Sequence, residues 1–179
     1  LTYGAYPAFV AYAGSISVND ETFTALVTEI ADAIIDSGAK SLFIIDTGIS
    51  TIAPVDAAIH ASRHNSRVRH ITVFRGSRFL TAAHSLMQQP YGSHADEIET
   101  SLMLVIAPQL VDMTRARASP FSAAGPAPGP LSPDHQRSPN YSPSGSYGDP
   151  TLASVDKGTR LLAAILEDLR EEATAKQGG

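Results

Sequence analysis

The sequence predicts an α/β fold, a three-layer α/β/α sandwich built around a mainly parallel sheet. A segment with helical apolar spacing is followed by a short continuous apolar run, and a second helix and second run follow in the same order. Alternating helices and strands are typical of parallel strands joined by crossover connections. With 179 residues, 43% of them hydrophobic, the chain is long enough to form its own core. We therefore expect a single domain over residues 1–179.

The first predicted helix spans Asn19 to Ser37. Asn19 is placed to cap its start, and Gly38 is placed to end it in the left-handed backbone conformation. Its apolar side chains recur at intervals of three and four residues: Phe23, Leu26, Val27, Ile30, Ala31, Ile34 and Ile35. The segment from Ser41 to Asp46 then has an uninterrupted apolar centre, which predicts an inner parallel strand covered on both faces.

Three further elements follow along the chain. The alanine-rich segment from Pro54 to His64 is predicted to be a helix, and the alternating segment from Val68 to Phe74 is predicted to be a strand. Apolar spacing predicts another helix from Ala95 to Ile106, with Ser93 as its N-cap and Pro108 closing it.

The segment from Ser119 to Pro150 has a different composition. It holds eight of the twelve prolines of the chain, together with glycine and serine, and few large aliphatic residues. This predicts an irregular loop or arm within the domain. Helical spacing returns from Leu152 to Ala175, where a long amphipathic helix is predicted.

Composition excludes several classes of function. The chain has 13 Lys and Arg against 18 Asp and Glu, and the basic residues are scattered, which argues against nucleic-acid binding. It has no cysteine, which excludes thiolate metal sites and a cysteine nucleophile. No apolar run reaches the roughly 20 residues that a membrane span requires, and no signal-peptide pattern is present. We therefore expect a cytoplasmic protein that binds neither nucleic acid nor membranes.

The densest polar cluster lies between Gly92 and Ser101. It places His94 three residues before Glu97, on one face of the predicted helix, and turns Glu99 toward Met103. One interpretation is a helix cap with acids at the positive end of the dipole. The other is a chemical site, because an imidazole beside carboxylates can move protons or bind a metal.

The segment from Asp46 to Thr51 follows the carboxyl end of the predicted inner strand. Ligands of open parallel sheets bind at that edge, although Asp and Gly are also ordinary turn formers, so a plain turn is the alternative. The candidate substrate-binding residues are Asp46, Thr47, Ser50 and Ser93. His60 and His64 share a helix face without a carboxylate partner in sequence, and we expect surface or capping roles for them.

Three motifs carry a resemblance to a known family. They are Tyr3-Gly4 with Gly14-Ser-Ile-Ser-Val18, the segment Gly92-Ser-His-Ala followed by Glu99-Thr-Ser-Leu-Met-Leu104, and Gly148-Asp-Pro150 with Lys157-Gly158. In this order they resemble segments of the creatininase (creatinine amidohydrolase) family, over residues 3 to about 169.

The resemblance implies a creatininase-like sandwich with a two-metal centre, of zinc or manganese, that hydrolyses the C–N bond of a small cyclic or linear amide. It places His94 on the family's proton-relaying histidine. Glu97 and Glu99 fall on acidic positions that line the metal pocket, so Glu97 is a candidate for catalysis and metal binding and Glu99 for metal binding. It also implies a homo-oligomer, a hexamer in the family, with the 119–150 arm ordered by neighbouring subunits.

The sequence departs from the family pattern in two places. Gly48 stands where the family has a metal-binding histidine, and the family's first strand and its other ligands precede the Tyr3-Gly4 motif, so we expect that segment to be missing from this chain. Counting the remaining donors predicts weak metal binding by these residues alone. Two functions stay open: an amidohydrolase with a remodelled metal site, and a non-catalytic family subunit or fragment with a degenerate one.

Overall fold

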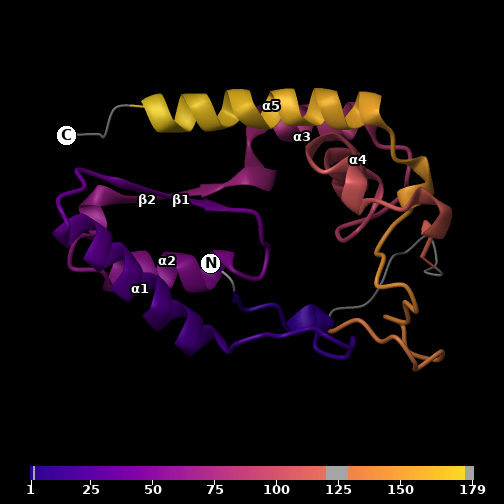
Figure 1. Ribbon diagram of the computed structural model, residues 1–179, viewed down its shortest axis with the longest axis horizontal. Coiled ribbons are helices and arrows are strands. Elements are labelled where there is room, and N and C mark those ends of the chain that lie inside the picture. Colours follow the sequence, from indigo (N-terminus) through magenta and orange to yellow (C-terminus); the bar gives the residue numbers. More distant parts are fainter. Residues whose placement is uncertain (2, 120–128, 176–179) are drawn as a thin grey trace. The chain divides into compact units, whose positions relative to one another are not determined.

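The computed structural model describes residues 1, 3–119 and 129–175 (Figure 1). The chain divides into two compact units. The first contains residues 1–7, 16–76 and the chain from 169 onward, and the second contains residues 8–15 and 77–168. The single domain predicted from the sequence remains a prediction.

The first unit contains a parallel sheet. Strand β1 (Leu42–Asp46) pairs with β2 (Val68–Thr72) in a register that sets Leu42 opposite Val68 and Asp46 opposite Thr72. Helix α2 (Ile52–Ala61) lies between them in sequence and forms the crossover connection (Figure 1). The α/β fold with parallel strands is therefore confirmed, and the sheet found among the described residues has two strands.

Helix α1 (Asp20–Asp36) forms where its apolar spacing predicts it. The side-chain oxygen of Asn19 accepts a 2.7 Å hydrogen bond from the N–H of Thr22, and Gly38 has φ +107°. Both predicted helix ends are therefore confirmed. The buried face of α1 packs with α2 in a core that contains Ala5, Phe23, Val27, Val55 and Ala58.

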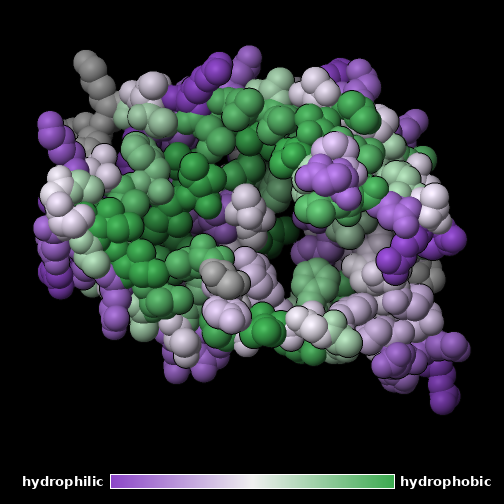
Figure 2. All heavy atoms as spheres, viewed as in Figure 1, coloured by the Kyte–Doolittle hydropathy of each residue, from purple (hydrophilic) through white to green (hydrophobic). Residues whose placement is uncertain are grey.

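Strand β1 is less covered than its sequence predicts. Ile45 is 56% exposed, and the side chains from Leu42 to Ile44 are half-buried, so coverage on both faces was a wrong expectation for this strand. The reason is that β1 has one partner strand among the described residues, and α1 and β1 leave a cavity of about 330 Å³ between them. Figure 2 shows hydrophobic residues gathered on this face over α1 and β1.

The second unit is helical. It contains α3 (Ser77–Leu86), α4 (Glu97–Ile106) and most of α5 (Val155–Thr174). Short 3-10 turns connect the elements of the chain: η1 (Pro7–Phe9), η2 (Asn65–Arg67), η3 (Val73–Arg75), η4 (Pro108–Leu110), η5 (Met113–Arg115) and η6 (Pro150–Leu152). No helix in the described part of the chain is both long and apolar enough to cross a membrane.

Helix α3 is missing from the sequence prediction. Its signal is the spacing of Phe79, Ala82, Ala83 and Leu86, which is helical but built partly from small residues. A distant carboxylate caps its start, because Asp168 of α5 accepts hydrogen bonds from the N–H groups of Arg78, at 3.2 Å, and Phe79, at 2.9 Å. Local sequence does not show this cap.

Helix α4 begins at Glu97, and its N-cap is Asp96, not Ser93 as predicted. One carboxylate oxygen of Asp96 accepts from the N–H groups of Ile98 and Glu99, both at 2.9 Å. Ser93 cannot take this place because it lies four residues before the first helical residue, and Ala95 between them has φ +45°, which is not a helical conformation.

Part of the predicted 119–150 arm, residues 120–128, lies outside the described residues. Residues 129–149 form no helix or strand, as predicted, and they contact their own unit. Leu131 is 2% exposed and its N–H donates to the carbonyl of Ala8 at 2.9 Å, while the hydroxyl of Tyr12 donates to the carbonyl of Ser142 at 2.5 Å.

Candidate functional site

The loop after β1 is organised by the carboxylate that ends the strand. One oxygen of Asp46 accepts hydrogen bonds from the N–H of Gly48, at 2.9 Å, and from the hydroxyl of Thr51, at 2.7 Å. Asp46 is 9% exposed and Thr51 is 2% exposed. The loop therefore closes around its own first residue before α2 begins.

A histidine from the neighbouring strand completes this cluster. Nε2 of His70 lies 3.2 Å from the second oxygen of Asp46, and Nδ1 lies 2.7 Å from a carboxylate oxygen of Asp56. The imidazole of His70 thus lies between two carboxylates, one at the end of β1 and one on α2. The cluster links β1, β2 and α2. Sequence analysis missed His70 and Asp56, although His70 lies on the same strand face as the buried Val68.

The loop has no room for a side chain at position 48. A β-carbon added to Gly48 would overlap the hydroxyl oxygen of Thr51 and lie 3.4 Å from Asp46 Oδ1. Of the predicted substrate residues, Asp46 and Thr47 line the cavity between α1 and β1. The hydroxyl of Ser50 instead donates to the carbonyl of Ala5 at 2.6 Å.

The imidazole of His94, in the second unit, lies edge-on to two aromatic rings. Its centroid is 4.8 Å from that of Phe9 and 5.7 Å from that of Tyr147. Burial lowers the pKa of His94 below its ordinary value, and the charge of Asp96 opposes this with a smaller effect. Burial therefore favours the neutral form of the ring. Its nitrogens form no hydrogen bond with the described residues.

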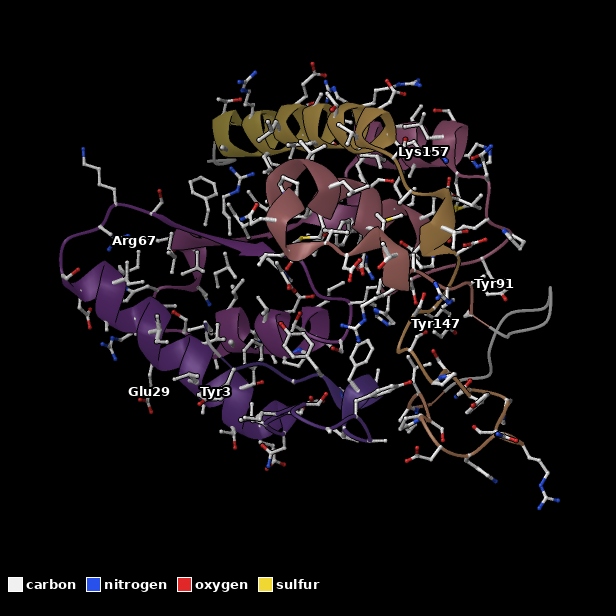
Figure 3. The ribbon with its side chains drawn as sticks, turned by 45° about the vertical axis from the view of Figure 1, so that its right-hand side comes forward. Tyr3, Glu29, Arg67, Tyr91, Tyr147 and Lys157 are labelled. Atoms are coloured by element: carbon white, nitrogen blue, oxygen red, sulfur yellow. The ribbon has the colours of Figure 1, made fainter. Side chains whose placement is uncertain are left out.

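The backbone around His94 is held in a fixed shape. The backbone of His94 forms an isolated antiparallel β-bridge with that of Tyr147, which is labelled in Figure 3. In this bridge the N–H of Tyr147 donates to the carbonyl of His94 at 2.7 Å. The next residue is Ala95. Among the described residues it is the one non-glycine residue whose φ is positive, at +45°. Such a conformation costs of order 1 kcal/mol and persists where surrounding contacts impose it.

Gln89 joins the His94 segment to the segment before α5. Its side-chain nitrogen donates to Asp96 Oδ2 at 2.7 Å, and its oxygen accepts from the N–H of Asp149 at 2.8 Å and of Glu97 at 3.2 Å. Gln89 is 3% exposed. The glycines of two motifs are required here: a β-carbon at Gly92 would overlap the side chains of Gln89 and Asp96, and one at Gly148 would lie 2.5 Å from Gln89 Oε1.

Glu97 lies at the centre of a buried hydrogen-bond network. It is 0% exposed, and one oxygen accepts from the N–H groups of Gln88, at 2.9 Å, and Gln89, at 2.8 Å. The other oxygen pairs with the ammonium of Lys157 at the start of α5 (Figure 3). The next residue, Gly158, lets α5 approach α4, because a β-carbon there would overlap the carbonyl oxygen of Ser101.

Glu99 faces a different environment. It lines a cavity together with Met103, in agreement with the helical spacing, and His94 and Glu97 do not line this cavity. One oxygen accepts a 2.7 Å hydrogen bond from the N–H of Ala95. Burial raises the pKa of Glu99, the hydrogen bond from Ala95 opposes this, and the negative charge of Asp96 adds to the rise.

Comparison with known proteins identifies the family. The family model described as "Creatininase: Creatinine amidohydrolase" matches residues 1–173. The chain belongs to the creatininase family. No curated protein sequence matches it significantly.

Solved creatininase structures share the fold. A glutamate-to-glutamine mutant creatininase complexed with creatine is 20% identical, with a TM-score of 0.76 over 99% of this chain and 75% of that chain. A structure titled "Creatininase Mn" is 21% identical, with a TM-score of 0.71 over 92% and 68%. A protein of Bacteroides fragilis, provisionally named a creatinine amidohydrolase, is 20% identical, with a TM-score of 0.70 over 99% and 72%. These likenesses extend over nearly the whole chain.

The described residues of this creatininase-family chain do not fit the metal centre that the family implies. Within residues 1, 3–119 and 129–175, no group of three His, Asp or Glu side chains converges on a point that could hold a metal ion. The carboxylates of Asp46 and Glu97 are taken by protein donors, and both nitrogens of His70 face carboxylates. No chemical step is therefore assigned to a metal.

The candidate residues fall in both units of the chain. Asp46, Thr47 and Ser50 belong to the first unit, whereas Ser93, His94, Glu97 and Glu99 belong to the second. That the two groups share one site remains a prediction. Gln89 and Lys157, which sequence analysis did not select as site residues, organise the second group through the hydrogen bonds described above.

Proposed function

We propose that this chain is a creatininase-family amidohydrolase that hydrolyses a non-peptide C–N bond of a small cyclic or linear amide, with His94 carrying the proton. The observation that supports the proposal is the environment of the His94 ring. Burial lowers its pKa and so favours the neutral imidazole, and its nitrogens are free of hydrogen bonds to the described residues. The strained residue Ala95 and the bridge to Tyr147 hold it in place.

The chemistry requires such a group. Hydrolysis adds water across the C–N bond, so one proton leaves the attacking water and one arrives on the leaving nitrogen. A neutral imidazole accepts the first proton and, once protonated, donates it to the nitrogen. A ring that is already protonated could not accept it, which is why the lowered pKa of His94 favours this role.

The other candidate residues have supporting roles in this proposal. Glu97 positions the segment, because its carboxylate joins residues 88–89, α4 and α5 through buried bonds. Asp46, Thr47, Ser50 and Ser93 are proposed to contact the substrate, whereas Glu99 lines a cavity that His94 does not line. The remaining part of the proposal is a homo-oligomer, hexameric as the resemblance implies, within a three-layer α/β/α architecture.

A second candidate function is a family member without hydrolytic activity. The observation that favours it is the closed loop after β1, in which Asp46, Gly48 and Thr51 satisfy one another and leave no room for a side chain at position 48. Zn and Mn are named in structures of related creatininases, but this loop and its neighbours do not supply the donors of such a site. In this case the fold would serve binding or assembly.

One experiment separates the two functions. The purified chain is incubated with creatinine and with creatine, with and without added zinc or manganese, and the products are quantified by NMR. The first function predicts hydrolysis that falls by about 100-fold or more in His94→Ala, as expected for loss of a proton-transferring group. The control is His84→Ala, the same substitution at an exposed position of α3, which is expected to leave hydrolysis unchanged. Equal loss in both variants would contradict the role of His94, and a complete absence of hydrolysis would favour the second function.

A further inference from the structure

The second unit has a cavity of about 370 Å³ that nothing above assigns to a function. Its apolar lining comes from α4 and from the segment that follows it: Met103, Leu110, Val111 and Met113. Methionine side chains are flexible and polarisable, and they adapt to apolar ligands of different shapes. Leu110 is 74% exposed and Met103 is 37% exposed, so these side chains are accessible to a ligand.

The cavity contains one half-buried charged side chain, Glu99. One of its oxygens accepts from the N–H of Ala95, whereas the other has no hydrogen-bond partner among the described residues. Glu99 also forms no ion pair with any Lys or Arg in the described part of the chain. The open oxygen is an acceptor beside apolar walls, where a hydrogen bond from a charged donor is strong, so the cavity favours a ligand that brings a positive charge and a donor.

The remaining charged residues of the lining are exposed. Asp112 is engaged by Thr114, whose N–H and hydroxyl donate to it at 3.0 and 2.6 Å. The guanidinium of Arg117 donates to the carbonyls of Thr114 and Ala116. Arg115 is exposed to water, where its charge is screened. Glu99 is therefore the group in this cavity that a ligand would pair with.

We propose that this cavity binds a small organic ammonium ion with an aromatic or aliphatic body. The ammonium donates to the open oxygen of Glu99, and the body packs against Met103, Leu110 and Met113. The site does not depend on hydrolysis, because His94 does not line the cavity. It therefore holds or fails separately from the proposed function.

The methionines of the chain provide the test. Of the three, Met103 and Met113 line the cavity, and Met87, just after α3, does not. Benzylammonium is titrated into the full chain labelled with 13C at the methionine methyl groups. We expect the Met103 and Met113 signals to shift along one saturable curve and the Met87 signal to stay in place. Benzyl alcohol, which has the same ring without the charge, is expected to bind at least tenfold more weakly.

Substitution of the carboxylate completes the test. Glu99→Gln keeps the size of the side chain and an oxygen for the N–H of Ala95, and it is expected to weaken benzylammonium binding at least tenfold. Glu29→Gln, at an exposed position of α1 (Figure 3), is the matched control and should leave binding unchanged. Equal affinity of the amine and the alcohol, unchanged binding in Glu99→Gln, or an equal shift of Met87 would overturn the proposal. If Glu99→Gln does not fold, the comparison of the two ligands decides.

Discussion

The backbone N–H of Asp149 donates a 2.8 Å hydrogen bond to the side-chain oxygen of Gln89, which lies 60 residues earlier in the chain. Through its amide nitrogen, the same glutamine holds Asp96, the N-cap of α4. One buried side chain thus fixes the start of α4, next to His94, against the segment that leads into α5. The family motifs around Gly92 and Gly148 are explained by this contact, since both glycines make room for it.

Gln89→Ala is expected to destabilise the chain by about 3 kcal/mol, because it leaves the N–H groups of Asp149 and Glu97 and an oxygen of Asp96 without their partner. Urea unfolding followed by circular dichroism measures the change. Gln109→Ala, at an exposed position of η4, is the control and should change the unfolding free energy by less than about 0.5 kcal/mol. Equal midpoints for both variants would contradict the role of Gln89.

Gly148→Ala is expected to destabilise more than Gly14→Ala. Both glycines have positive φ, +139° and +86°, so both substitutions strain the backbone. Only the β-carbon at position 148 also meets other atoms, 2.5 Å from Gln89 Oε1 and 2.7 Å from the β-carbon of Asp96, whereas nothing lies within 4 Å at position 14. We expect a cost of about 1 kcal/mol for Gly14→Ala and at least about 3 kcal/mol for Gly148→Ala by urea unfolding. Similar costs would show that packing at position 148 is unimportant.

The stability of the chain is expected to fall as the pH falls below about 6.5, the ordinary pKa of histidine, in part because of His94. Burial lowers the pKa of His94 in the folded chain, so below pH 6.5 the unfolded chain binds the proton more readily and unfolding is favoured. His94→Phe removes this titration and should lose less stability than the unsubstituted chain between pH 7.5 and pH 5. Urea unfolding at the two pH values measures the difference, with His84→Phe as control. A loss in His94→Phe as large as in the control variant would refute the prediction.

Gly48→Ala is expected to destabilise the loop after β1 by about 2 kcal/mol, because the new β-carbon overlaps the Thr51 hydroxyl. Thr51→Ala removes that hydroxyl together with its hydrogen bond to Asp46, and the same Gly48→Ala change should then cost at least about 1 kcal/mol less. A double-mutant cycle of unfolding free energies measures this coupling. Additive costs would mean that the two positions do not meet.

The sequence by itself determined the elements whose signals are local. Apolar spacing and the Asn19 cap predicted α1, and the continuous run before Asp46 predicted a strand that is indeed parallel to the strand at Val68. Helix periods, caps and turn residues act over a few positions, so they can be recognised in the residues themselves. The ordered motifs likewise indicated the creatininase family, which the family model confirmed.

Only the tertiary structure decided which distant groups meet. His70 reaches Asp46 because the two strands pair in parallel, and Gln89 reaches Asp149 because two glycines let their segments approach. The same glutamine holds Asp96, which caps α4 in place of Ser93. Each of these contacts depends on the close approach of segments far apart in sequence, and its hydrogen bonds form only after the backbone has folded around them.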